Sequence, residues 1–168
     1  MKPKTASGPD NISGDILKTG STTIINKLKD RFNRYLEEER IPDQWKTSRT
    51  VLLFKKGDRD NIKNYRPIAL LSQPYKLFTE ILLNRLERIL DGFQPVEQAG
   101  FRKGFSCMDH IQSVTQLIEK TREYKQPLLL CFVDYVKAFD SVELNAVWNA
   151  LSRAGVDPKY INMLEQCN

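Results

Sequence analysis

Two aspartates that follow an apolar run are the residues of this sequence best placed to do chemistry. Asp134 comes directly after the run at residues 128–133, and Asp140 stands six positions later. The run has no polar alternation, which is typical of a strand covered on both faces, so Asp134 is expected at the end of that strand. A carboxylate held there suits Mg²⁺, which prefers oxygen ligands. The alternative is a carboxylate that only caps a helix or pairs with a cation.

Asp140 has a structural role available in its own neighbourhood. Residues 140–143 read Asp-Ser-Val-Glu, which has the form of a capping box ahead of an apolar helix at residues 143–153. We therefore predict that Asp140 or Ser141 is the N-cap of that helix rather than a second catalytic carboxylate.

The remaining candidate metal ligands are sparse. The chain has three cysteines without a CxxC pair, Cys107, Cys131 and Cys167, and one histidine, His110. A zinc site is excluded by these counts and spacings. Cys131 lies inside the apolar run and is predicted to be a small buried core residue, and His110 at a helix start is predicted to be structural.

The positive charge is concentrated in one stretch. The formal net charge is +5, and residues 46–66 account for all of it with seven basic and two acidic side chains. Such a patch suits the phosphates of a nucleic acid or a nucleotide, and a solvated surface is the alternative. The mean hydropathy of −0.47 is typical of a soluble globular protein. No apolar run has a membrane-spanning length, and the first ten residues lack the apolar core of a signal peptide, so we expect an intracellular protein.

The elements that must position these residues form an α+β pattern. Helices are predicted at residues 12–18 with Asp10 as cap, 21–40, 74–90, 108–124 and 143–153, with a further helix at the end of the chain. Residues 49–54 and 64–71 predict a hairpin with a cation-rich tip. Residues 128–133 predict a buried strand.

Five ordered segments resemble motifs of the reverse transcriptases of non-LTR, LINE-type retrotransposons. Residues 134–140, DYVKAFD, resemble their motif A, D-x-x-K-A-F-D. Residues 8–12, GPDNI, resemble the entry motif GPDGI, with Asn11 at the usual glycine. Residues 55–58, KKGD, and 64–68, NYRPI, resemble fingers motifs, and residues 98–102, QAGFR, resemble the segment that precedes motif A. The resemblance covers about residues 7–168.

The resemblance implies a right-hand polymerase fold, with fingers at about residues 7–125 and the start of the palm at residues 126–168. Asp134 would bind the two Mg²⁺ ions of nucleotidyl transfer, with the backbone carbonyl of Tyr135 as a further ligand. The incoming dNTP would be held by Lys55, Lys56, Arg66 and the steric gate Phe139. Four residues would lie near the RNA template and the DNA primer: Gln98, Gly100, Phe101 and Arg102.

The sequence also departs from this family. Nothing after Asp140 resembles motif B or motif C, and no Asp-Asp pair occurs anywhere in the chain. One carboxylate cannot hold two divalent ions, so we expect this chain alone to be inactive. Phe105 and Cys107 stand where the family tends to carry small or basic residues. The leading hypothesis is a LINE-type RNA-directed DNA polymerase fragment, expected in cytoplasm and nucleus. The alternatives are a non-catalytic RNA-binding relic of a decayed element and a group II intron maturase-like enzyme, which fits KKGD and KAFD less well.

Overall fold

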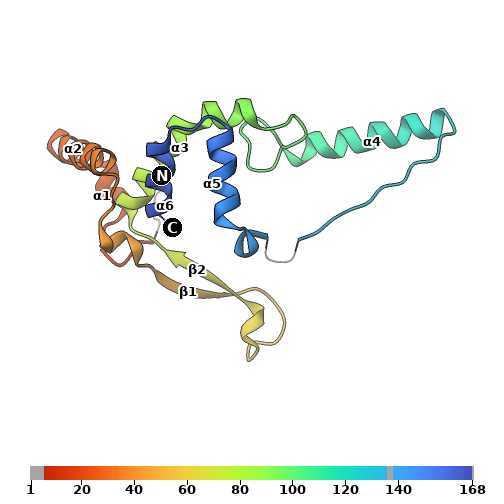
Figure 1. Cartoon of the computed structure of the whole chain (residues 1–168). Helices are drawn as coiled ribbons and strands as arrows, with labels where there is room; N and C mark the ends of the chain where they lie inside the picture. The colour runs from red at the N-terminus through yellow and green to blue at the C-terminus, as the bar shows by residue number, and fades with distance from the viewer. Residues whose placement is uncertain (1–5, 136–137, 168) are drawn as a thin grey trace. The chain divides into compact units, whose positions relative to one another are not determined.

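The computed structural model describes residues 6–135 and 138–167, and their helices and strands are shown in Figure 1. The chain divides into two compact units. The first comprises Met1–Glu87 with Gly155–Asn168, and the second comprises Arg88–Ala154. Among the described residues, none of the helices combines the length and the apolar character needed to cross a membrane.

Helices α2 and α3 build the first unit, together with the last helix of the chain. These are α2 (Thr22–Glu38), α3 (Gln73–Phe93, which continues into the second unit from Arg88) and α6 (Pro158–Gln166). The prediction of α2 is confirmed, and the helix ends where Glu39 adopts a left-handed φ of 49° ahead of Pro42.

The core of this unit is aromatic. Trp45, in the short helix η1 (Asp43–Lys46), has its ring within 5.3–6.2 Å of four other rings, those of Phe32, Tyr35, Tyr75 and Phe78. Met163 of α6 is fully buried against this cluster, and the hydroxyl of Tyr75 donates to the backbone carbonyl of Cys167 at 2.7 Å. Ring pairs of this kind add stability beyond the area they bury.

The N-terminal motif packs onto the start of α3 and does not start a helix at Ile12. Helix α1 spans Gly14–Lys18 with Ser13 as its N-cap, so the predicted cap role of Asp10 is wrong. The Asp10 carboxylate instead accepts hydrogen bonds from the Ile12 amide at 3.2 Å and from the Ser72 hydroxyl at 2.6 Å. The reason is the left-handed φ of 55° at Asn11, which interrupts helical geometry just after Asp10.

The predicted hairpin is confirmed. Strands β1 (Arg49–Phe54) and β2 (Tyr65–Leu70) pair antiparallel, with Phe54 opposite Tyr65 and Arg49 opposite Leu70. They are joined by a loop that contains the short helix η2 (Ile62–Asn64) (Figure 1). Five apolar side chains of these strands are nevertheless 39–54% exposed: Val51, Leu52, Leu53, Phe54 and Ile68.

Helices α4 (Cys107–Glu123) and α5 (Leu144–Arg153) lie in the second unit, close to their predicted bounds. The helical spacing of Ile111, Leu117 and Ile118 predicts a buried face on α4, but this prediction is wrong, because the three side chains are 39–55% exposed. The capping prediction is also wrong. Asp140 and Ser141 belong to the short helix η3 (Ala138–Ser141), where the Ser141 hydroxyl donates to the Ala138 carbonyl. The chain therefore enters α5 later, with Glu143 at the N-cap.

The predicted buried strand at residues 128–133 is wrong as well. This segment forms no ladder and runs extended between α4 and η3 (Figure 1). Leu129 is 96% exposed and Phe132 83% exposed, and Cys131 is exposed rather than buried. A strand needs a hydrogen-bonded neighbour, and in the described part of the chain the only sheet is the β1–β2 hairpin.

Candidate nucleotide and nucleic-acid interface

The tip of the hairpin is built by its two motifs acting together. The Lys55 amide donates to the Asn64 carbonyl at 2.8 Å, and the Asn64 side-chain amide donates to the Asp58 carbonyl, also at 2.8 Å. Gly57 has a φ of 96°, and a Cβ atom on it would lie 2.8 Å from Nδ2 of Asn64. Only glycine suits that conformation and that contact. Residues 55–58 and Asn64, the first residue of the second motif, are therefore parts of one turn.

The Asp58 side chain and two neighbouring side chains bind within this turn. The Asp58 carboxylate accepts from the Asp60 amide at 3.0 Å, and the Tyr65 hydroxyl donates to the Arg59 carbonyl at 2.9 Å. The Arg59 guanidinium lies over the Phe54 ring, 5.4 Å from its centroid. Such local side-chain bonds hold a turn in one conformation.

Three cations of the hairpin are exposed and, among the described residues, have no acidic partner. Lys55, Lys56 and Arg66 are all exposed, and Arg66 lies opposite Leu53 in the hairpin register. In the described ranges, the ion pairs join Lys46 to Asp43, Arg102 to Asp91 and Lys120 to Glu123, so none involves these three residues. Their charge is available to an external anion, and a planar guanidinium and two ammonium groups on one hairpin suit a polyphosphate.

Arg102 organises the loop between α3 and α4. Its Nε lies 2.6 Å from the Asp91 carboxylate, and its terminal nitrogens donate to the backbone carbonyls of Asp91 and Pro95, each at 3.1 Å. Its guanidinium also lies 4.8 Å from the centroid of the Phe105 ring. The Arg102 side chain is only 12% exposed. Its donors are thus largely used within the protein.

The neighbours of Arg102 shape the same loop. The Gln98 side-chain amide donates to the Gly100 carbonyl at 3.1 Å. Phe101 has a left-handed φ of 59° and a side chain that is 96% exposed. Its ring meets the Phe139 ring edge to face, with centroids 5.5 Å apart and planes at 82°. The contact leaves Phe139 itself 78% exposed. The predicted sugar gate and the QAGFR segment therefore touch.

Asp134 lies at the end of the exposed extended segment, and its carboxylate is open to solvent. Residues 136 and 137, in the middle of the proposed motif A, lie outside the described residues. Within residues 6–135 and 138–167, no group of three or more His, Cys, Asp and Glu side chains is placed to hold a metal ion. One carboxylate and the Tyr135 carbonyl are too few for two Mg²⁺ ions. The described residues therefore do not by themselves fit that metal pair.

The candidate residues fall into two groups. Lys55, Lys56 and Arg66 share one hairpin in the first unit, and the other candidates belong to the second: Gln98, Gly100, Phe101, Arg102, Asp134, Tyr135 and Phe139. Sequence reasoning missed the role of Asn64, although it lies in a motif, and that of Asp91, for which no sequence signal existed. It also missed the Asp10–Ser72 bond, which joins residues far apart in the chain.

Comparison with known proteins explains why these motifs occur together. Residues 54–167 match the family model described as reverse transcriptase (RNA-dependent DNA polymerase). The chain is 32% identical over 142 residues to the probable RNA-directed DNA polymerase from transposon BS of Drosophila melanogaster. The aligned stretch covers 83% of this chain and 16% of that protein. It is also 32% identical over 158 residues to the putative 115 kDa protein of the type-1 retrotransposable element R1DM of the same fly, covering 92% of this chain and 15% of the relative.

A third relative also comes from a retrotransposable element. The Pol polyprotein from the type-1 retrotransposable element R2 of Popillia japonica is 32% identical over 117 residues, 70% of this chain and 16% of the relative. The chain thus spans about 15–16% of the length of these relatives. From the matched family model, and from relatives encoded by non-LTR retrotransposons, we conclude that the chain belongs to the reverse transcriptase family, enzymes with a polymerase-type fold.

Proposed function

We propose that this chain supplies the fingers, at about residues 7–125, and the start of the palm, at residues 126–168, of an RNA-directed DNA polymerase. The enzyme adds deoxynucleotides to the 3′-hydroxyl of a DNA primer on an RNA template. The observation that carries the proposal is the hairpin tip, where a hydrogen-bonded turn and the adjoining strand β2 present three exposed cations that lack an acidic partner among the described residues.

The hairpin binds the triphosphate of the incoming nucleotide. The Arg66 guanidinium offers a planar fork for two phosphate oxygens, and Lys55 and Lys56 add compact charges. The bonds from Asn64 to the loop fix the backbone at Lys55 before the ligand arrives. A preformed turn loses less entropy on binding than a mobile one, so less of the attraction between cations and phosphate is spent on ordering the loop.

The second unit carries the candidate residues for the reacting groups. The Asp134 carboxylate and the Tyr135 carbonyl are the groups of this chain that would bind Mg²⁺. The described residues do not supply the other ligands that such a site needs. Phe139 acts as the gate that crowds a ribose 2′-hydroxyl, and the edge contact with Phe101 restrains its ring. The exposed Phe101 also offers a face for stacking of a template or primer base.

Arg102 takes part indirectly. Its guanidinium is bound by Asp91 and by loop carbonyls, so it holds Gln98, Gly100 and Phe101 in place rather than gripping nucleic acid itself. A positioning role of this kind explains why an arginine in a template-binding segment is only 12% exposed.

The test compares two variants of equal charge. In the first, Lys55, Lys56 and Arg66 become Gln, and in the matched control Lys27, Arg31 and Arg34 of α2 become Gln. All six residues are exposed, and both changes remove three positive charges. Binding of dGTP and of a single-stranded RNA is measured by fluorescence anisotropy across a salt series. The hairpin variant should lose dGTP binding and lower the salt slope for RNA by about 2, since each contact to single-stranded nucleic acid contributes about 0.7.

Equal losses in both variants would contradict a specific phosphate site on the hairpin. RNA binding that depends on the hairpin, with no binding of dGTP, would instead support the non-catalytic RNA-binding alternative. We also expect no primer extension by this chain alone, because it supplies one catalytic carboxylate. Synthesis from Mg²⁺ and dNTPs that disappears in Asp134→Asn would overturn that expectation.

A further inference from the structure

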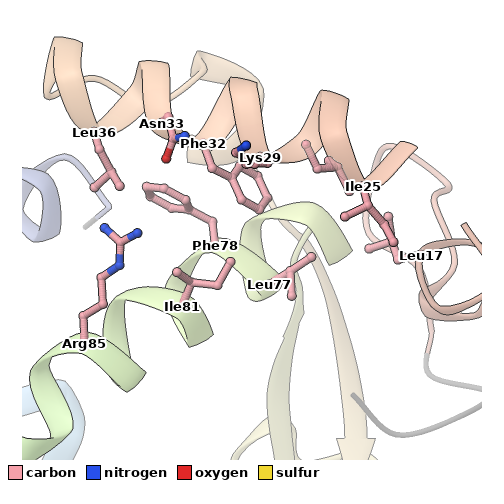
Figure 2. Close-up of a pocket in the computed structure, with 11 residues that line it drawn as sticks. Leu17, Ile25, Lys29, Phe32, Asn33, Leu36, Leu77, Phe78, Ile81 and Arg85 are labelled. Atoms are coloured by element: carbon pink, nitrogen blue, oxygen red, sulfur yellow. The ribbon is translucent and has the colours of Figure 1, made fainter. Parts of the chain in front are cut away.

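We propose that the groove between α2 and α3 is a docking site for an amphipathic helix that carries carboxylates along its edge, contributed by a partner polypeptide. The groove has a volume of about 250 Å³ and lies in the first unit (Figure 2). It takes no part in the polymerase site proposed above.

The groove has an apolar floor and apolar walls. Phe78, which is 1% exposed, and Phe32, which is 6% exposed, form the floor. The walls are formed by aliphatic side chains of α1, α2 and α3: Leu17, Ile25, Leu28, Leu36, Leu77 and Ile81. Ile25 remains 57% exposed at the rim, so the groove presents apolar surface that an occupant would bury.

The shape of the groove favours a helix over a small molecule or a strand. Sites for cofactor-sized molecules usually enclose about 300–1,000 Å³, which is more than this groove holds. Its walls are helices, whose backbone groups bond internally, so they offer no edge for an added strand. An occupant must therefore satisfy its own backbone, and a helix does so while inserting apolar side chains. The stretch of α2 that lines the groove, residues 25–36, is about 18 Å long, which matches about 12 residues of a docked helix.

The charges at the rim select acidic partners. Lys29 comes from α2 and Arg85 from α3, and in Figure 2 the Arg85 guanidinium points toward α2. Both residues are exposed, and among the described residues no carboxylate lines the groove. Neither has an ion pair within the described ranges, and Arg85 makes only a 3.3 Å hydrogen bond to the Tyr160 hydroxyl. Carboxylates on a docked helix would complement both cations.

The test uses the chain itself and two synthetic helical peptides. Both have fourteen residues with leucines at helical spacing, and their flanking positions carry Glu in one peptide and Lys in the other. Anisotropy should show the Glu peptide binding at least about tenfold more tightly, or about 1.4 kcal/mol. Lys29→Glu leaves one cation and one carboxylate at the rim, so that preference should largely disappear. Lys103→Glu, an exposed lysine of the other unit, changes the net charge equally and should leave the preference unchanged.

A second variant tests the groove rather than its charge. Ile25→Asp places a carboxylate at the rim on a residue already half exposed, so the fold should survive, and both peptides should lose binding. The proposal is overturned if the two peptides bind the parent chain equally, if Lys29→Glu leaves the preference for the Glu peptide as large as in the parent chain, or if Ile25→Asp binds them as well as the parent chain. It is also overturned if dodecanoate, an acyl carboxylate, occupies the groove and the Glu peptide does not.

Discussion

Replacing Gly8 by alanine should destabilise this chain strongly, although it adds a single methyl group. A Cβ atom on Gly8 would lie 2.6 Å from the Leu71 carbonyl carbon and 2.6 Å from the Ser72 nitrogen. Both are backbone atoms between β2 and α3, so neither can rotate away as a side chain would. The segment that carries Gly8 and Asp10 must therefore lift off α3.

The cost follows from the bonds that this movement breaks. The Ser72 hydroxyl donates to the Asp10 carboxylate at 2.6 Å, and a hydrogen bond to a charged group is worth about 1.5–3 kcal/mol. The Gln73 side-chain amide donates to the Ala6 carbonyl at 2.8 Å, a neutral bond worth about 0.5–1.5 kcal/mol. Because the two bonds are lost together and need not add, we expect Gly8→Ala to lower the free energy of unfolding by about 2–4 kcal/mol.

Urea unfolding measures this change through the fluorescence of Trp45, which lies in the core cluster of the same unit, in a Trp148→Phe background. Gly92→Ala is the matched control. Gly92 lies in α3 with no atom within 4 Å of its would-be Cβ, so alanine should stabilise the helix by up to about 1 kcal/mol. In a Ser72→Ala background, Gly8→Ala should cost at least about 1 kcal/mol less. If both glycine variants shift stability in the same direction, the steric argument fails.

Three further predictions concern the pH response, the α3–α4 loop and the hairpin turn. Burial, and then the neighbouring Cys167, raises the pKa of Tyr75 to about 12. The contribution of the Tyr75 hydroxyl to the free energy of unfolding should therefore be constant below about pH 10. It should fall between pH 10 and 12, where the unfolded chain loses this proton and the folded chain keeps it. The stability gap between the parent and Tyr75→Phe should therefore narrow over that range, by no more than about 1.4 kcal/mol per pH unit, and a constant gap in urea unfolding would contradict this. Arg102→Lys cannot keep the forked bonds to Asp91 and should lose about 2–3 kcal/mol in the same assay, with a smaller loss in an Asp91→Asn background. Gly57→Ala should loosen the turn and speed hydrogen exchange of the Lys55 amide, whereas unchanged exchange would show that the contact with Asn64 yields easily.

The hairpin could be predicted from the sequence because its determinants are local. Residues 49–54 are rich in β-forming side chains, and the cation-rich turn after Phe54 contains Gly57. Both signals lie within one short stretch, so no distant contact was needed to interpret them. The structure adds the role of Asn64, which bonds across the turn to Asp58.

The failed predictions depended on contacts that a local pattern does not contain. Asp10 resembled a helix cap, but its partner Ser72 lies 62 positions away. Residues 128–133 have the composition of a buried strand, yet a strand also requires a neighbour, and these residues run exposed. Asp140 resembled a cap because its spacing to Glu143 matched a known box, whereas a short helix at Ala138–Ser141 places the N-cap at Glu143.

The motif residues of this chain separate into two physical classes. Gly8, Gly57 and Arg102 are tied to nearby backbone or side-chain atoms, so their identity is explained by the fold. Lys55, Lys56, Arg66 and Asp134 are exposed, and in the described part of the chain their side chains make no hydrogen bond or ion pair. Stability does not account for them, and substitutions there should change the free energy of unfolding by less than about 0.5 kcal/mol. Measuring stability and phosphate binding on the same variants therefore separates residues that build the site from residues that face a ligand.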